Sequence, residues 1–177
     1  MTSPYELALQ QLQQSELLAT AADVDAALDR IADALTATHA QSAPLVLTVG
    51  GSAIALTGLL LTRLAFPLEY GTLHLTTIQS GGQKDWRVAP SAPVAGRCVI
   101  VVDDLLDDGR TMAAIHRRLK EFGAAEVTTV VLCDKVPSPD KPIQADHVGF
   151  AAPNRYVFGC GMELDGFWRN LKELRVA

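Results

Sequence analysis

The 177-residue chain is poor in cysteine and in basic residues, and each shortage argues against a class of protein. It contains three cysteines, Cys98, Cys133 and Cys160, at no metal-ligand spacing; an odd number without a secretory signal predicts reduced thiols in a cytoplasmic compartment. Each stands in an apolar stretch, which favours a core position over a reactive role. The 15 basic residues are outnumbered by 20 acidic ones, and the net charge of −5 argues against broad nucleic-acid binding.

Long uncharged segments are also scarce. Residues 45–62 approach the length of a membrane span, but Gly50 and Gly51 interrupt them. A strand over 45–49, a glycine turn and a buried helix over 52–64 explain this stretch better than a membrane anchor. The first 18 residues contain no basic segment followed by an apolar one, so we expect neither export nor membrane attachment.

The remaining composition, 49% hydrophobic and 20% charged, is typical of a folded globular protein. The length fits one domain over residues 1–177, and no internal repeat or linker divides it. Between residues 21 and 38, apolar side chains recur every three or four positions and predict an amphipathic helix. We expect the whole of the first forty residues to be helical.

Further along the chain, short apolar runs alternate with helical segments. Residues 79–92 are rich in Gly, Ser and Pro and predict a loop or a short hairpin. Helices are predicted over 52–64 and 111–122, and strands over 45–49, 68–77, 97–102, 127–133, 147–151 and 156–160. This order predicts an α/β fold with a mostly parallel sheet, in which ligands bind beyond the carboxyl ends of the strands.

The loop after Val102 holds four carboxylates in six residues, Asp103, Asp104, Asp107 and Asp108. Such a cluster after a buried strand is costly unless it meets positive charge. The glycine that follows permits a tight turn, and the helix that begins there offers unpaired N–H groups to an anion. A sugar phosphate would suit both parts. The alternative is a solvated turn in which Asp107 or Asp108 is the helix N-cap.

The stretch VVDDLLDDGRTM, residues 101–112, closely resembles the signature by which type I phosphoribosyltransferases bind 5-phosphoribosyl-1-pyrophosphate (PRPP). By this resemblance, Asp103 and Asp104 face the ribose hydroxyls and its metal ion, and residues 107–111 hold the 5-phosphate. The resemblance also implies a twisted sheet flanked by helices, with a small hood from the terminal parts of the chain. The implied PRPP-binding residues are Asp103, Asp104, Asp107, Asp108, Gly109, Arg110 and Thr111.

Residues 135–171 resemble the C-terminal third of hypoxanthine-guanine phosphoribosyltransferases. This implies that Lys135 bonds the exocyclic oxygen of a 6-oxopurine, that Tyr156 stacks on the base and that the backbone of Val157 reads its edge. Mg²⁺ is the implied cofactor, PRPP and a purine base are the implied ligands, and a homodimer or homotetramer is the implied assembly. Pyrophosphate is assigned to Gly50, Gly51 and Arg169, and the metal to Asp103, Asp104 and Glu163.

The implied activity is purine salvage, with Asp107 as the general base that accepts the purine proton. Two departures from the family pattern stand out. Residues 76–86 correspond to a loop that covers the site but are fewer here, and residues 48–52 lack the Lys or Asn that many members place before the glycines. The alternative is therefore a degenerate regulator that binds PRPP or a nucleotide without efficient catalysis. The sequence does not separate hypoxanthine, guanine and xanthine as substrates.

Overall fold

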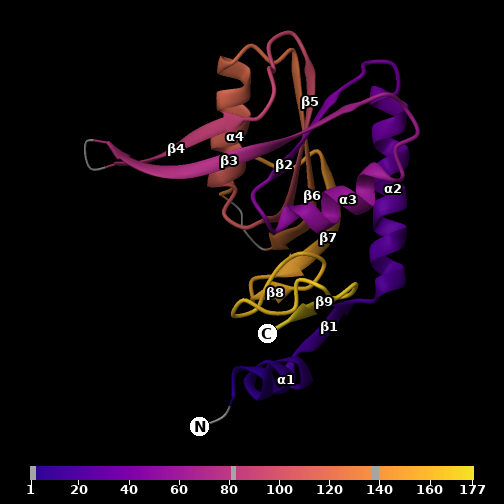
Figure 1. Cartoon of the computed structure of the whole chain (residues 1–177), viewed down its shortest axis with the longest axis vertical. Helices are drawn as coiled ribbons and strands as arrows, with labels where there is room; N and C mark the ends of the chain where they lie inside the picture. Colours follow the sequence, from indigo (N-terminus) through magenta and orange to yellow (C-terminus); the bar gives the residue numbers. More distant parts are fainter. Residues whose placement is uncertain (1–2, 81–82, 137–139) are drawn as a thin grey trace.

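Helices and strands alternate along most of the chain (Figure 1) in this computed structural model, which describes residues 3–80, 83–136 and 140–177. The helices are α1 (Pro4–Gln14), α2 (Ala21–His39), α3 (Ala53–Leu61) and α4 (Arg110–Glu121). The strands are β1 (Glu16–Ala19), β2 (Leu45–Val49), β3 (Glu69–Ser80), β4 (Gln83–Pro90), β5 (Cys98–Leu106), β6 (Glu126–Val136), β7 (His147–Pro153), β8 (Val157–Phe158) and β9 (Leu174–Val176).

Two sheets divide the strands between a large body and a small hood. The body is a six-stranded sheet in the order β4-β3-β2-β5-β6-β7, parallel except for the edge pair β3 and β4. This confirms the α/β fold with a mostly parallel sheet. The hood is a three-stranded antiparallel sheet in the order β1-β9-β8, formed by the two terminal parts of the chain (Figure 1).

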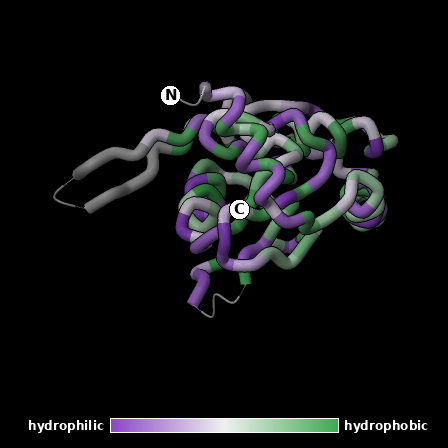
Figure 2. Tube along the Cα trace, turned by 90° about the horizontal axis from the view of Figure 1, so that it is seen from below, coloured by the Kyte–Doolittle hydropathy of each residue, from purple (hydrophilic) through white to green (hydrophobic). Residues whose placement is uncertain are grey.

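The core lies on both faces of the large sheet because side chains alternate along each strand. On one face, Val46 and Ile100 pack with the apolar stripe of α2, which includes the fully buried Leu28 and Leu35, and with α3. On the other face, Leu47 packs with α4. Burying one such leucine contributes about 1.5–3 kcal/mol. Figure 2 shows α2 and α4 nearly end-on, each with mixed hydrophobic and hydrophilic residues, as expected for helices that bury one side.

The prediction of an uninterrupted helical N-terminus is wrong. Helix α1 ends at Gln14, and β1 then pairs with β9, which lies about 160 residues away in the sequence. Both α1 and α2 begin with a capping box, Ser3 with Glu6 and Thr20 with Asp23. The second box marks where the chain leaves the hood and enters the body.

Residues 79–92, expected to be a loop or a short hairpin, contain the end of β3 and the whole of β4, which form a long hairpin. Strand β4 pairs antiparallel with β3 from Leu73 opposite Pro90 to Ser80 opposite Gln83. The hairpin projects from the edge of the sheet in Figure 1. Residues 81–82, within the predicted covering loop, and 137–139, within the proline-rich loop after β6, lie outside the described residues.

The cysteines largely follow expectation. Cys133 and Cys160 are buried, while Cys98 is partly exposed, so the expected core position is wrong for Cys98. Burial raises the pKa of Cys133 to about 12 and that of Cys160 to about 11, which keeps both thiols protonated and unreactive at neutral pH. Among the described residues, no helix has both the length and the apolar composition to cross a bilayer.

Candidate active site

A pocket of about 320 Å³ opens between the carboxyl edge of the large sheet and the hood. Its walls come from the loop before α3, the ends of β5 and β6, and the segment from β8 onward. The lining residues are Ser52, Asp104, Leu105, Asp107, Lys135, Tyr156, Val157, Met162, Glu163 and Arg169. Seven of these are predicted site residues: Asp104, Asp107, Lys135, Tyr156, Val157, Glu163 and Arg169.

The strand before the acidic loop is longer than expected, so the loop begins later in the chain. Strand β5 runs on through Leu106, so Asp103 and Asp104 belong to the strand, and Asp103 pairs with Val131 of β6. Asp103 does not line the pocket; its Oδ1 accepts a hydrogen bond from the backbone N–H of Asp104 at 3.0 Å. Burial and the neighbouring Asp104 raise the pKa of Asp103 well above its usual range. Within the described residues, neither carboxylate forms a salt bridge, so the pair could meet a cation.

The N-terminus of α4 is open to an anion. Gly109 is its N-cap, with φ of +75°, and the N-cap residue itself makes no side-chain capping hydrogen bond. Asp108 accepts a hydrogen bond from the backbone N–H of Arg110 at 2.9 Å. The alternative in which Asp107 or Asp108 is the N-cap is therefore wrong. A left-handed glycine at a helix N-terminus is the backbone geometry that the predicted anion cradle requires.

Asp107 and Lys135 face each other across the ends of two neighbouring strands. Asp107 follows β5, Lys135 lies near the end of β6, and their Oδ1 and Nζ atoms are 3.4 Å apart. The Lys135 side chain is 14% exposed, whereas Asp107 is 66% exposed. A mostly buried ammonium thus lies beside an accessible carboxylate, which places one hydrogen-bond donor next to one acceptor at the pocket wall.

The hood supplies the opposite wall. Tyr156 is half exposed, and Val157 is buried and pairs with Val176 in the small sheet. Further along, Arg169 donates to the carbonyl oxygen of Gly161 at 2.8 Å and lies 3.7 Å from the carboxylate of Glu163. The residues expected to bind pyrophosphate and metal are therefore paired with each other.

The glycine loop before α3 lies against the hood. Gly50 has φ of +60°, which glycine adopts without strain, and a side chain at Gly50 or Gly51 would meet open space. Neither glycine lines the pocket, but the next residue, Ser52, does. The carbonyl oxygen of Ser52 would lie 2.1 Å from a Cβ at Gly161, so the hood backbone approaches this loop closely.

Sequence reasoning missed three lining residues, Ser52, Leu105 and Met162. Ser52 follows the two glycines at the N-cap position of α3, and that position was a usable signal. Leu105 lies inside the recognised signature. Met162 had no signal in the sequence, because its place depends on how the hood packs.

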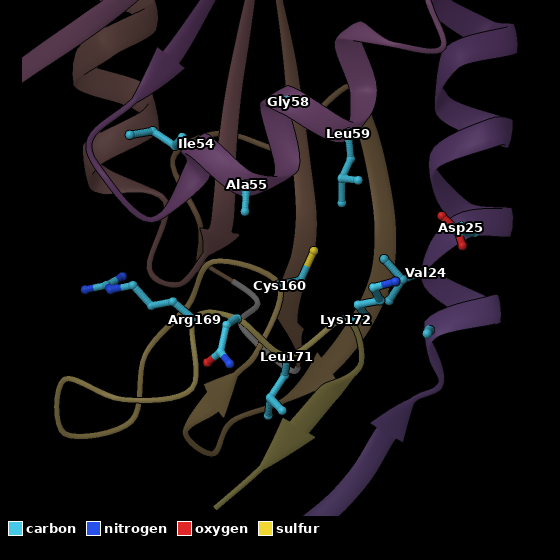
Figure 3. A pocket seen from close by; sticks show the side chains of 12 residues that line it. Val24, Asp25, Ile54, Ala55, Gly58, Leu59, Cys160, Arg169, Leu171 and Lys172 are labelled. Carbon is cyan, nitrogen blue, oxygen red and sulfur yellow. The ribbon is translucent and has the colours of Figure 1, made fainter.

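A second hollow, of about 460 Å³, was not expected (Figure 3). It is bordered by α2, by α3 and by the segment from Cys160 to Lys172, and apolar side chains such as Ile54, Leu59 and Leu171 surround much of it. Arg169 borders both hollows. The two hollows therefore share one wall of the hood.

Magnesium would find hard oxygen ligands here, although not a complete cage of side chains. No group of three or more His, Cys, Asp or Glu in the described part of the chain could hold a metal ion. In the part of the chain that the structure describes, neither Asp103 nor Asp104 forms a salt bridge, and Asp104 lines the pocket. This pair fits a cation that takes only one or two protein ligands. Mg²⁺ typically binds in this way, with substrate phosphates and water completing its shell.

Known proteins share this arrangement. Residues 13–165 match the phosphoribosyl transferase domain. A bifunctional protein TilS/HprT of Listeria innocua is 33% identical over 141 residues, which cover 77% of this chain and 22% of that protein. The hypoxanthine-guanine phosphoribosyltransferase of Lactococcus lactis is 28% identical over 145 residues, covering 80% of this chain and 79% of that one.

A solved structure of a hypoxanthine-guanine-xanthine phosphoribosyltransferase is 26% identical and superposes with a TM-score of 0.79, covering 91% of this chain and 95% of that one. This chain spans about a fifth of the length of the Listeria protein but most of the length of the other two. The chain therefore belongs to the phosphoribosyl transferase domain family and resembles its hypoxanthine-guanine members.

Proposed function

We propose that this protein transfers the 5-phosphoribosyl group of PRPP to hypoxanthine or guanine, giving IMP or GMP and pyrophosphate. The observation that carries the proposal is the 3.4 Å separation of Lys135 Nζ and Asp107 Oδ1. In a 6-oxopurine, O6 and N7 lie side by side on one edge. When N7 carries its proton, that edge presents an acceptor beside a donor, which matches the lysine and the carboxylate.

The reaction would form a bond between N9 of the purine and C1 of the ribose while the bond from C1 to pyrophosphate breaks. Asp107 accepts the proton that leaves N7, and its exposure leaves it accessible to the base. Lys135 holds O6 and orients the ring, and Tyr156, half exposed at the mouth of the pocket, offers a face for stacking. These roles follow the same assignments that the family resemblance implies.

PRPP would lie along the carboxyl edge of the sheet. The uncapped start of α4, with Asp108, Gly109, Arg110 and Thr111, holds the 5-phosphate. Asp103 and Asp104 hold the ribose hydroxyls and, with Glu163, are the protein groups available to Mg²⁺; when bound, this ion neutralises charge on the departing pyrophosphate. Pyrophosphate would lie against the turn of Gly50 and Gly51, where the Gly50 N–H already donates to the carbonyl oxygen of Leu73 at 3.3 Å. Arg169 reaches the pyrophosphate by exchanging Glu163 for the new anion.

The chain would act as one unit over residues 1–177, because body and hood contribute to the same pocket.

We also propose a homodimer or homotetramer. Helix α3 carries no charge, yet Ile54 is 56% and Leu59 is 40% exposed on it. Light scattering should show more than one chain per particle, and Ile54→Asp should shift the distribution towards the monomer. Free thiols at all three cysteines support a reducing, cytoplasmic compartment.

The direct test is product formation from PRPP and five bases in parallel: hypoxanthine, guanine, xanthine, adenine and uracil. We expect nucleotide from the 6-oxopurines and none from adenine or uracil, and we expect excess EDTA to abolish the activity. PRPP binding without turnover of any base would instead favour the alternative of a non-catalytic regulator. Preference for adenine would contradict the role of Lys135 and leave the PRPP site standing.

A further inference from the structure

Lys141 is the least exposed lysine of the ion pairs near the site, and the proposed reaction does not use it. Its side chain is 7% exposed, and its Nζ contacts three oxygens. It donates to the carbonyl oxygens of Lys135 at 2.8 Å and Leu106 at 3.0 Å, and it pairs with the carboxylate of Asp134. An ammonium has three N–H donors, so all of them are satisfied. A charge this deeply buried is expensive to place unless its contacts are needed.

The three oxygens belong to two strands at the point where their pairing stops. The parallel register of β5 and β6 ends with Leu106 opposite Asp134. Beyond this pair, no ladder hydrogen bond between described residues ties the two chain segments together. Lys141 bridges them there, one residue before Asp107 on β5 and at the backbone of Lys135 itself on β6.

The segment that carries Lys141 also covers the phosphate loop. A Cβ at Gly109 would lie 3.4 Å from the Cβ of Lys141, from Pro142 and from the carbonyl oxygen of Ile143. The segment thus lies against the start of α4, and the ammonium of Lys141 contacts the ends of β5 and β6. Lys141 therefore contacts the backbone next to the base-binding side chains of Asp107 and Lys135, and it also lies close to Gly109 in the phosphate-binding loop.

We propose that Lys141 is a positioning residue that sets the spacing between Asp107 and Lys135. The inference rests on the proposed function, because it assigns these two side chains to the same purine edge. Without the bridge, the two strand ends can move apart by fractions of an ångström, and the donor and acceptor no longer match O6 and N7. Misplacement of this kind lowers the rate of a positioned reaction even when every reacting group remains.

The test removes the bridge without leaving a buried charge. Lys141→Met combined with Asp134→Asn deletes both charges and keeps the size of both side chains. We expect kcat/KM for hypoxanthine to fall by about 10- to 100-fold, while PRPP binding measured by calorimetry changes much less. Lys141→Arg retains a cation with several donors and should recover part of the loss. Lys120→Met is the matched control, because Lys120 also donates to a backbone carbonyl, that of Ala125, at the C-terminal end of α4.

Two further measurements separate positioning from a purely structural role. If Lys141 acts through Lys135, adding the double substitution to Lys135→Ala should cost much less than it does in the wild type. Amide hydrogen exchange should accelerate at residues 106–109 and 134–136 and stay unchanged in the core strands. Additive losses, or wild-type kcat/KM in a folded double variant, would overturn the inference. If the wild type makes no nucleotide, the proposed function fails, and unchanged exchange at these residues would still refute the bridge by itself.

Discussion

The two walls of the pocket are built on different principles. Asp104, Asp107 and Lys135 stand on or beside strands of the large sheet, where Val99–Val102 and their partners in β6 form an unbroken buried ladder. The hood wall rests on β8, which has two residues, and on a looped segment with little regular pairing. Backbone hydrogen bonds and apolar burial place the first wall, and individual tertiary contacts place the second.

The strain in the hood makes this difference plain. Cys160, Asp165 and Trp168 all have positive φ, between +49° and +70°, a conformation that costs about 1–3 kcal/mol for residues other than glycine. Helix α1 holds two of them: the indole N–H of Trp168 donates to the carbonyl oxygen of Ala8 at 3.2 Å, and Gln11 donates to Asp165 at 2.6 Å. A helix from one end of the chain therefore stabilises the loop between Glu163 and Arg169 near the other.

The largest expected effect lies on the sheet wall. Asp107→Asn should lower kcat by about 10²- to 10⁴-fold, because an amide cannot accept the purine proton, and PRPP affinity should remain close to that of the wild type. Steady-state kinetics and calorimetry check both parts. A mutant with wild-type turnover would reduce Asp107 to a loop residue.

Lys135→Ala should weaken recognition of the purine base and leave PRPP binding unchanged. Losing one charge-assisted hydrogen bond should lower kcat/KM for hypoxanthine and guanine by about 10- to 100-fold and narrow the discrimination against adenine, whose 6-amino group opposes the lysine in the wild type. The assay is kcat/KM for the three bases in both proteins. Equal hypoxanthine kinetics in mutant and wild type would remove Lys135 from base recognition.

Removing the two hydrogen bonds from α1 to the hood should have a smaller effect, on KM more than on kcat. Gln11→Ala combined with Trp168→Phe removes both bonds from α1 and keeps an aromatic ring at position 168. We expect KM for PRPP to rise by roughly 3- to 10-fold, with a smaller change in kcat. The reason is that the loop loses a stabilising free energy of about one net hydrogen bond. Thr38→Ala, at the far end of α2 from the hood, serves as the control. An unchanged KM would show that the hood loop keeps its shape without α1.

The smallest effect concerns pH. Arg155, in the turn before β8, forms an ion pair with Glu16 at the start of β1. The hydrogen bond and the charge of Arg155 lower the pKa of Glu16. A lowered carboxyl pKa gives stability that is present above the unfolded value near 4.5 and is lost as pH falls through the folded value. Arg155→Ala should therefore leave the acid-induced drop in Tm slightly shallower below that pH. Parallel thermal melts between pH 7 and pH 3 test this, and identical slopes would contradict it.

Prediction from sequence succeeded for the parts of the fold that a local pattern of residues records. The apolar runs predicted the strands of the large sheet, and the ends of two neighbouring strands bring together Asp107 and Lys135, both of them predicted site residues. It failed at the N-terminus, since helical periodicity gives no sign that residues 16–19 pair with a strand at the other end. At residues 79–92 it was right only in part: the hairpin alternative holds, but the Gly, Ser and Pro content gave no sign of how far β4 pairs along the edge of β3.

By itself, the sequence determined the parallel sheet, its buried strands and the acidic loop that follows one of them, because these depend on apolar runs and on residue types at short spacing. Only the tertiary structure decided that Arg169 pairs with Glu163, that Met162 and Ser52 line the pocket, and that Lys141 bridges two strand ends. The physical reason is range. Helix caps, turns and alternating burial are set within a few residues, whereas the hood is held by contacts between residues far apart in the chain, and no local pattern records them.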